Sequence, residues 1–374
     1  MTNPSGYLDA ASSEPMHPAA REAFLAALDQ GYADPRRLHG PGRNARLILD
    51  NARAVVADCL EARPDEVTFT SSGTDAVHRG LLGLRLGRAR SGQAVVHTAV
   101  EHSALLHAAD WVEGEHVSVP VGPDARVRLP ELTEAAQRPG TAVVGVQAAN
   151  HEVGTLQPVE EIAAALGDVP LFVDAGASMG RLPLPRGWAA AAGSAHKWGG
   201  PAGVGVLLVR KGARWRNPFP VDDRVDERAS GFENVPAALA AAAALRATTE
   251  ERDSLNARHH AMIDRIRVAA AALPDTEVVG DPVDRLPHLV TFSCLYVDGE
   301  ALVHALERRG FGVASGSACT SSTLEPSHVL AAMGALTHGN IRVSLTRDAT
   351  DDEVGRLCAA LPDIVADLRA ELDL

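Results

Sequence analysis

Lys197 stands in the segment GSAHKWGGPAGVG (193–205), in which Gly and Pro follow it closely. These residues favour turns, so the lysine is expected on irregular backbone and not on a solvated helix face. A lysine in a desolvated pocket has a lowered pKa and can form a Schiff base with a carbonyl compound. Ser194 and His196 flank it with groups able to bind a phosphate. A polar loop with a surface lysine fits the segment about equally well.

Two other segments end apolar runs with polar residues. Asp174 closes the run LFVD, where a carboxylate can pair with a protonated pyridine nitrogen, although a turn or helix cap is the commoner role of a lone aspartate. The segment FTSSGTDA (69–76) predicts a strand, a turn and a helix, and its free N–H groups favour phosphate binding. The candidate phosphate residues there are Ser72, Gly73 and Thr74. Many strand–helix turns share this pattern, so it is weak evidence alone.

Three more segments hold candidate residues next to or within apolar runs. His102, in VEHSALL, could stack on a flat cofactor or move protons, and a structural histidine is an equally good interpretation. Asn150 and His151 follow another run, in QAANHEVG. Arg342, in GNIRVSL, has a fork geometry that suits a carboxylate, with an ordinary ion pair as the alternative.

Cys319 lies among Gly and Ser in VASGSACTSSTLEPSHVL (313–330), whereas a buried cysteine usually packs among apolar residues. We therefore expect an accessible thiol. Cys59, Cys294 and Cys358 lie in apolar surroundings and are predicted to be core residues without a catalytic role. The four cysteines lie far apart without a CxxC pair, so we expect no disulfide framework and no metal site, and a reducing cytoplasm.

Composition narrows the class of protein. The chain has 374 residues, 46% of them hydrophobic, which is enough for a large core and two domains. A net charge of −13 argues against nucleic acid as a partner, because phosphate binding needs a basic surface. No run approaches the roughly 18 apolar residues of a membrane span, and the N-terminal residues show no export signal.

The elements that must position these residues are strands alternating with helices. Through the first two-thirds of the chain, strand-like apolar runs alternate with segments whose apolar residues have helical spacing. This alternation predicts a mostly parallel sheet covered by helices on both faces. The strand-like runs lie at 66–71, 94–100, 141–149, 171–176 and 203–211. Ligands of such folds bind at the carboxyl ends of the strands. Residues 235–273 predict one long helix, or two in series, that leads into a smaller α+β unit.

Taken together and in order, the motifs resemble the group I cysteine desulfurases, in the class V branch of the fold type I enzymes that use pyridoxal 5'-phosphate. The likeness runs over nearly the whole chain and includes YLDAASSEP, FTSSGTDA, VEHSALL, ANHEVGTLQP, VDAGASMGRLP, SAHKWGGPAGVG, SGSACTSSTLEPSHVL and IRVSL. It implies an α/β fold with a large cofactor-binding domain (16–255) on a mostly parallel seven-stranded sheet. It also implies a smaller α+β domain (1–15 and 256–374) that carries the Cys319 loop.

The resemblance further implies a role for each candidate. Lys197 would form the Schiff base with the cofactor, Asp174 would pair with its pyridine nitrogen, and His102 would stack on its ring. Thr74, Ser194 and His196 would hold the phosphate, and Asn150 would lie near the ring hydroxyl and the substrate. Arg342 would bind the carboxylate of L-cysteine. Cys319 would take up the sulfur as a persulfide, releasing L-alanine, and pass it to an acceptor protein; the enzyme would be a homodimer.

The sequence departs from the family pattern at several positions. Ala10 stands where the family usually has Asn. Ala177 replaces the Gln that forms a hydrogen bond with the ring hydroxyl of the cofactor. Asp34 replaces an Asn that helps to bind the substrate carboxylate, so it should repel the substrate unless Arg36 or Arg37 compensates. Phe232 replaces a Thr that reaches the phosphate across the dimer. These departures keep two alternatives open: another enzyme of this fold (a C–S lyase, selenocysteine lyase or aminotransferase) and a weakly catalytic scaffold.

Overall fold

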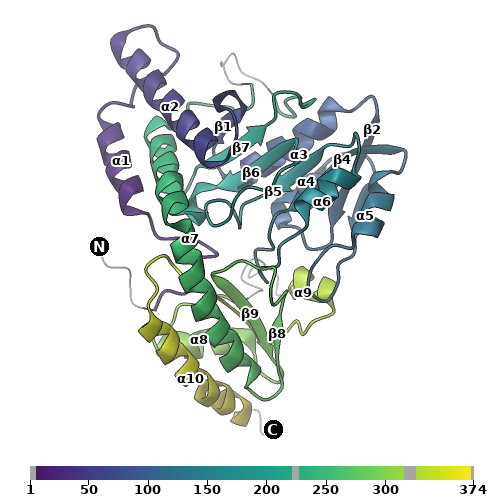
Figure 1. The fold of residues 1–374 in the computed structure, drawn as a ribbon, viewed down its shortest axis with the longest axis vertical. Helices are drawn as coiled ribbons and strands as arrows, with labels where there is room; N and C mark the ends of the chain where they lie inside the picture. Colours follow the sequence, from purple (N-terminus) through teal and green to yellow (C-terminus); the bar gives the residue numbers. More distant parts are fainter. Residues whose placement is uncertain (1–5, 221–226, 316–325, 372–374) are drawn as a thin grey trace.

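The computed structural model describes residues 6–220, 227–315 and 326–371. Its larger layer is a seven-stranded sheet in the order β1-β7-β6-β5-β4-β2-β3, with helices on both faces (Figure 1). Strands β6, β5, β4, β2 and β3 pair in parallel, while β7 is antiparallel to both of its neighbours. The prediction of a mostly parallel seven-stranded sheet is confirmed.

Apart from β2 and β3, the strands of this sheet are buried along almost their whole length, as expected for a sheet that helices cover on both faces. They are β1 Val67–Thr70, β2 Gly92–Thr98, β3 His116–Val119, β4 Gly140–Gln147, β5 Leu171–Asp174, β6 Ala190–Ser194 and β7 Gly205–Val209. The helices of this part are α1 Pro18–Leu28, α2 Gly40–Cys59, α3 Gly73–Gly87, α4 Ser103–Trp111, α5 Leu129–Ala136 and α6 Val159–Ala165.

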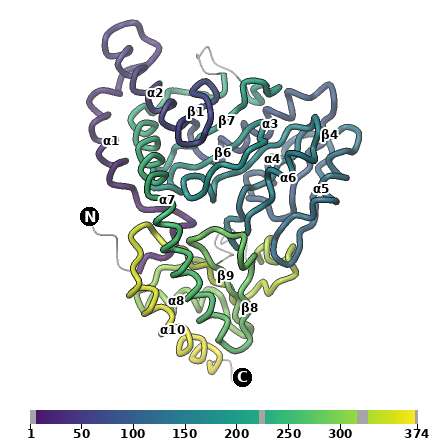
Figure 2. The backbone as a smooth tube through the Cα atoms, viewed as in Figure 1, coloured from purple at the N-terminus to yellow at the C-terminus, as the bar shows by residue number. Residues whose placement is uncertain are grey.

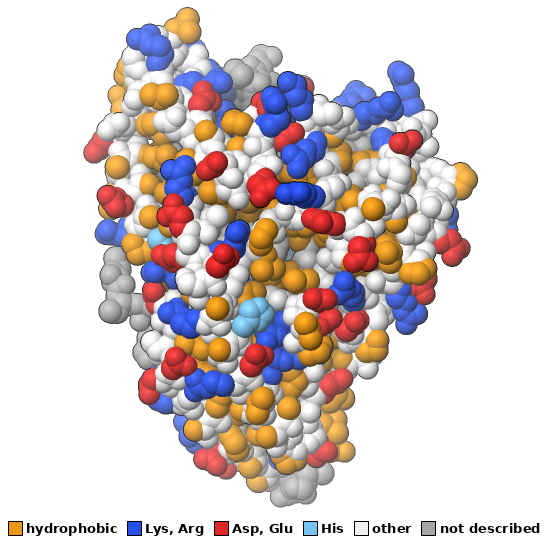
Figure 3. Space-filling view, viewed as in Figure 1, with side chains coloured by type: hydrophobic (Ala, Val, Ile, Leu, Met, Phe, Trp, Pro, Cys, Tyr) orange, Lys and Arg blue, Asp and Glu red, His pale blue; other side chains and the backbone are white. Residues whose placement is uncertain are grey.

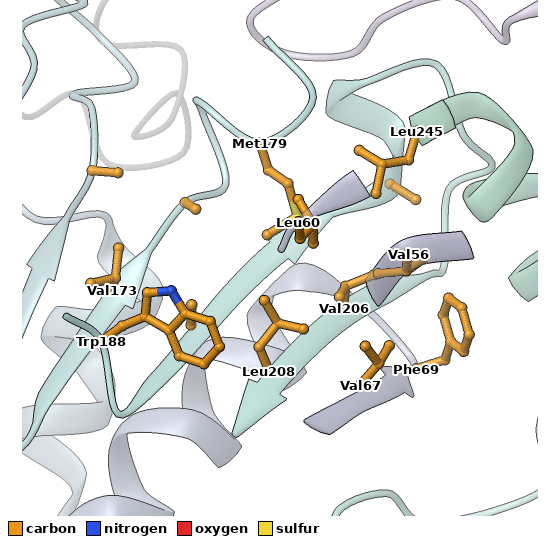
Figure 4. Close-up of a cluster of buried hydrophobic side chains, with 14 of the residues drawn as sticks. Val56, Leu60, Val67, Phe69, Val173, Met179, Trp188, Val206, Leu208 and Leu245 are labelled. Atoms are coloured by element: carbon orange, nitrogen blue, oxygen red, sulfur yellow. The ribbon is translucent and has the colours of Figure 1, made fainter. Parts of the chain in front are cut away.

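One core lies between this sheet and the helices α1, α2 and α7 (Val235–Ala271). Figure 4 shows strand residues packed beside side chains from α2 and α7: Val67, Phe69, Val206 and Leu208 with Val56, Leu60 and Leu245. A second core, on the opposite face, packs α3 and α4 against the sheet. Burying both faces removes the strands from water and fixes their positions.

A smaller sheet, β10-β9-β8, builds the second unit. Its strands are β8 Thr276–Val279, β9 Leu289–Cys294 and β10 Asn340–Ser344, and its helices are α8 Gly299–Arg308, α9 His328–Met333 and α10 Asp351–Ala370. Its core is separate and includes Leu8 from the N-terminal segment. The single helix α7 runs between the two units (Figure 2).

The structure corrects several details of the sequence-based prediction. Residues 235–273 hold one helix, and not two in series. Strands β3 and β6 were missed, because HVSV is half exposed and AAAGS has few residues typical of strands. Cys294 is buried as predicted, whereas Cys59 and Cys358 are only half-buried. The division at residue 255 falls inside α7 and stays a prediction.

None of the described helices is both long and apolar enough to cross a bilayer. Figure 3 shows cationic and anionic side chains interspersed over the face in view. Such mixing gives no extended basic stripe there for a phosphate backbone to follow.

Candidate active site

The candidate site lies at the carboxyl ends of β4, β5 and β6 and at the start of α3 and α4. Adjacent parallel strands end at the same edge of a sheet, so their following residues meet there. A cavity of about 160 Å³ opens at this edge. The predicted residues that line it are Gly73, Thr74, His102, Asp174, Ser194, His196 and Lys197.

Lys197 closes the one-turn helix Ala195–Lys197 that follows β6. The turn places its amine in the cavity, where Nζ donates to the carbonyl of Ala11. Ala11 belongs to the N-terminal segment, which the sequence did not connect with Lys197. The lysine is therefore held at the cavity wall by a contact from a distant part of the chain.

Asp174 is the last residue of β5 and is 8% exposed. Its Oδ1 accepts from the backbone N–H of Gly176 at 2.8 Å, as in the turn that the sequence offered as an alternative. The residue nevertheless lines the cavity together with Lys197. Asp174 thus shapes a turn and also lines the cavity, while its pairing with a pyridine nitrogen stays a prediction.

His102 caps the N-terminus of α4, and its Nδ1 accepts from the backbone N–H of Ala104 at 3.1 Å. Burial and the nearby Lys197 cation lower the pKa of His102, against the opposing effect of Asp174. The imidazole is therefore neutral near pH 7, and its broad face is available to a flat ligand. Its ring meets that of His151 edge-on, with 5.0 Å between centroids.

The residues predicted to bind phosphate lie together at the N-terminus of α3, where they form a cradle. A Cβ on Gly73 would lie 2.5 Å from Cβ of Ser194, so only glycine allows this approach. Ser194 Oγ and His196 Nδ1 are 3.0 Å apart. Burial and the adjacent Lys197 lower the pKa of His196, and a neutral imidazole still offers one N–H to an anion. The free N–H groups of the helix start favour a phosphate here.

Ser72, a further candidate for phosphate binding, is the N-cap residue of α3. Its hydroxyl oxygen accepts a hydrogen bond from the backbone N–H of Asp75 at 3.0 Å. Asn150 is fully buried and lies outside the lining of the cavity. Its Oδ1 accepts from the N–H groups of Glu152 and Val153, and its Nδ2 donates to the carbonyl of Val100. In the structure Asn150 therefore shapes the turn after β4.

Arg342 lies on β10, beneath the turn after β4, and is 4% exposed. It donates to the carbonyl of His151, to Asp9 Oδ1 and to Ser12 Oγ. It is not among the residues that line the cavity. Cys319 lies outside the described residues, so its predicted place in the site is not described.

Sequence reasoning noted His151 without assigning it a role and did not name Gln147, although both residues line the cavity. Gln147 is the last residue of β4 and His151 directly follows Asn150, and this closeness to Asn150 was the available signal. Glu101 is fully buried one residue before His102, where burial raises the pKa of its carboxyl far above the usual range. It accepts from Thr98 Oγ1 at 2.5 Å.

The structure also places three residues that depart from the family pattern, Ala10, Ala177 and Asp34. Ala10 and Ala177 line a small second cavity behind Lys197. Asp34 accepts from Nε of Arg36 at 2.9 Å and lies 3.5 Å from Nε of Arg37. Asp34 is thus paired with Arg36, which is the condition under which its extra charge would be compensated, and its effect on the substrate stays a prediction.

The residues present fit pyridoxal 5'-phosphate. The cavity combines an amine, a carboxylate at a strand end, a neutral imidazole and a cradle that glycine keeps open. These are the donor types that an aldehyde, a pyridine nitrogen, a flat ring and a phosphate require.

Comparison with known proteins gives consistent matches over almost the whole chain. The family model described as aminotransferase class-V matches residues 6–357. The IscS-like cysteine desulfurase of Mycobacterium tuberculosis is 35% identical over 382 residues, with 97% of both chains covered. Cysteine desulfurase IscS 1 of Archaeoglobus fulgidus is 33% identical, with 97% of this chain and 98% of the relative covered.

Solved structures agree with these matches. A NifS-like protein superposes with a TM-score of 0.89 at 27% identity, covering 97% of this chain and 100% of that one. DndA from Streptomyces lividans superposes with a TM-score of 0.77 at 26% identity, covering 91% and 99%.

Proposed function

The chain belongs to the class-V aminotransferase family, among its cysteine desulfurases, and from this premise we propose the mechanism by which its own residues act. The protein converts L-cysteine to L-alanine with pyridoxal 5'-phosphate and passes the sulfur through Cys319 to an acceptor. The observation that carries the proposal is that Lys197, Asp174 and His102 line one cavity beside the Gly73 cradle.

The cofactor would be held by residues at three strand ends. Lys197 would attach its aldehyde, Asp174 would pair with the pyridine nitrogen, and Thr74, Ser194 and His196 would bind the phosphate. When bound, pyridoxal phosphate withdraws electrons from the α-carbon of an amino acid. His102, a neutral imidazole, would cover the ring and exclude water from that face.

Two residues of the chain would act on the substrate. Arg342 would bind the carboxylate through its planar fork, which Asp9 and Ser12 already orient. Lys197 lines the cavity, and its Nζ would take up the proton from the α-carbon of the substrate. The role of Lys197 is supported by its place in the cavity lining. The role of Arg342 is supported by its contact with His151, which lines the cavity, and by the resemblance of the motifs.

Cys319 would be the sulfur carrier. Its thiolate would attack the substrate sulfur, so that the carbon–sulfur bond breaks, a sulfur–sulfur bond forms and a persulfide remains on the enzyme. A free thiol with a pKa near ~8.5 is only a few per cent ionised at neutral pH, so local positive charge or a base should assist it.

We also propose a homodimer that hands sulfur to an acceptor protein in the cytoplasm. The support is an exposed apolar set on and near α1 and α2, comprising Leu25, Leu28, Tyr32 and Leu47, each with 47% to 66% of its surface exposed. Exposed apolar side chains of this kind typically mark association surfaces.

The proposal is tested by incubating the purified protein with L-cysteine and reductant, and by measuring alanine and sulfide. Cys319→Ala and Lys197→Ala are assayed beside it. Alanine from the wild type and none from either variant is the expected result. Turnover that survives Cys319→Ala but not Lys197→Ala would instead assign a lyase or aminotransferase. A wild-type protein without bound cofactor or turnover would contradict the proposal.

A further inference from the structure

Helix α9 lies where the two units of the chain meet. Its buried side chains belong to one apolar cluster with residues of both units: Val329, Leu330 and Met333 of α9 with Val100, Val121, Ala125 and Val153 of the larger unit and Val279 of β8. Val100 lies in the turn after β2 and Val153 in the turn after β4. The helix therefore packs beside the two turns from which His102 and His151 reach the cavity.

His328, the first residue of α9, donates a hydrogen bond to the turn after β2. Its Nε2 lies 3.0 Å from the backbone carbonyl oxygen of Glu101. A carbonyl oxygen only accepts, so the imidazole carries a hydrogen on Nε2 in this contact. The neighbouring carbonyl of Val100 accepts instead from the side-chain amides of Gln147 and Asn150, which belong to the larger unit. The second unit thus supplies the side-chain contact at Glu101.

The carbonyl of Glu101 belongs to the same peptide unit as the backbone nitrogen of His102. A peptide unit is planar and rigid, so fixing this carbonyl also fixes the backbone from which the imidazole of His102 projects. The Nδ1 of His102 accepts from the backbone N–H of Ala104, which ties the ring to its own turn. A displacement of the peptide between Glu101 and His102 would therefore tilt the ring that lines the cavity.

The N-terminus of α9 is itself anchored, so His328 donates from a fixed place. Ser327 is 2% exposed, and its Oγ donates to Oε2 of Glu152 at 2.5 Å. The same Oγ accepts from the backbone N–H of Leu330 at 3.2 Å. Two consecutive residues, Ser327 and His328, thus bind the turns after β4 and β2 respectively.

We propose that His328 is a positioning residue for the cofactor: through the carbonyl of Glu101 it holds His102 at the angle at which the ring covers bound pyridoxal phosphate. This inference rests on the proposed function, because it takes pyridoxal phosphate to be the ligand of the cavity. It gives α9 a role in the cofactor site, although His328 does not line the cavity.

The experiment measures the dissociation constant of pyridoxal phosphate and the visible circular dichroism of the bound cofactor in the full-length protein. His328→Phe keeps an aromatic ring but removes the donor, so binding should weaken about threefold to fivefold, at most the effect of the hydrogen bond that is lost. The dichroic band should change as well, because it depends on the groups that surround the cofactor. His328→Gln restores an N–H donor and should stay within about twofold of the wild type in affinity.

A double-mutant cycle tests whether His328 acts through the ring of His102. His102→Ala should weaken cofactor binding by itself. If the contact works by positioning His102, His328→Phe should cause no further change of the dissociation constant or of the dichroic band in the His102→Ala protein. The full effect of His328→Phe in that background would overturn the inference.

Ser293→Ala is the matched control. Ser293 is buried in the second unit, and its Oγ donates to the carbonyl of Leu336, just after α9, at 2.9 Å. The variant loses a bond of the same kind that does not reach Glu101, so its affinity and dichroic band should remain those of the wild type. An equal loss in Ser293→Ala would indicate a general effect of the second unit and would overturn the inference.

Wild-type affinity and dichroism in folded His328→Phe would overturn the inference too, and thermal unfolding shows whether each variant is folded. His328→Leu, which also lacks a donor, replaces His328→Phe if the latter does not fold. Neither result would affect the proposed function, since cysteine turnover by the wild type tests that separately. A wild-type protein that does not bind pyridoxal phosphate would overturn both.

Discussion

Arg342 donates from Nη2 to the carboxylate of Asp9 across 2.9 Å, although the two residues come from opposite ends of the chain. The same nitrogen donates to Ser12 Oγ at 2.7 Å, and Nη1 donates to the carbonyl of His151 at 3.0 Å. These contacts orient the guanidinium before any substrate arrives. The N-terminal segment thus supports the site, and preorganisation of this kind lowers the cost of binding.

Asp9→Asn should weaken substrate binding, because the amide keeps an acceptor but removes the charge that orients Arg342. We expect the KM for L-cysteine to rise about fivefold to tenfold, with a smaller change in kcat, as for the loss of a charge-assisted hydrogen bond. Steady-state kinetics measures both. Asp348→Asn is the control, because Asp348 forms an exposed pair with Arg347. An unchanged KM would show that Asp9 does not hold Arg342 in the productive orientation.

Gly73→Ala should disrupt the phosphate cradle, because the added methyl group would lie 2.5 Å from Cβ of Ser194. We expect pyridoxal phosphate affinity to fall about tenfold, since overpacking against Ser194 costs about 1–3 kcal/mol and about 1.4 kcal/mol is a tenfold change. Gly40→Ala is the control, because a Cβ there meets no atom within 4 Å. Equal affinity in the two variants would argue against phosphate binding at the start of α3.

Glu152→Ala should loosen α9, because Ser327 caps that helix and donates to Glu152 Oε2 at 2.5 Å. Losing a buried acceptor costs about 1–3 kcal/mol of unfolding free energy, which urea denaturation measures. Hydrogen exchange of the Leu330 amide, which donates to Ser327 Oγ, should quicken. Glu131→Ala, at an exposed site, should have neither effect. Unchanged protection of α9 in Glu152→Ala would refute the link.

His259 should make the folded state sensitive to acid. Burial lowers its pKa to about 3, whereas an unfolded histidine titrates near ~6.5. Below pH ~6.5 the unfolded chain takes up a proton on His259 that the folded chain does not. The free energy of unfolding therefore falls as the pH decreases from ~6.5 toward 3. Above ~6.5 this loss is absent.

His259→Gln removes this proton uptake. When the pH is lowered from 7.5 to 5.5, the unfolding free energy of both proteins should decrease. The decrease should be about 1 kcal/mol smaller in His259→Gln than in the wild type. Urea denaturation at the two pH values measures the difference, and the exposed His338 provides the control variant His338→Gln. The same slope in all three proteins would contradict the assignment. Some slope should remain in His259→Gln, because His151 and His288 are also buried with lowered pKa values.

Asp34→Asn should change the KM for L-cysteine by less than about twofold, since its charge is already compensated. The hydrogen bonds from Arg36 lower the pKa of Asp34, and the side chain does not line the described cavity. Kinetics at low and high salt checks the prediction, because an unscreened carboxylate would give a salt-dependent KM. A large drop in KM in Asp34→Asn would show that the carboxylate repels the substrate after all.

The sequence by itself determined the local chemistry of the site and most of the sheet. Runs such as LFVD and TAVVGVQ are buried on both faces, and this continuous hydrophobicity is readable without a structure. The turn after each run must then carry the polar residues. Lys197, Asp174 and His102 could therefore be identified as strand-end candidates before their neighbours were known.

Only the tertiary structure decided which candidates share a cavity and what each side chain contacts. The strand order β6-β5-β4 brings Lys197, Asp174 and His151 together, and strand order depends on long-range pairing that no local pattern encodes. The structure also shows that Ser72 and Asn150 use polar atoms in caps and turns. The contact of Asp9 with Arg342 joins distant segments through the packing of the second unit. Such contacts depend on how cores pack, so their partners appear only when the chain is folded.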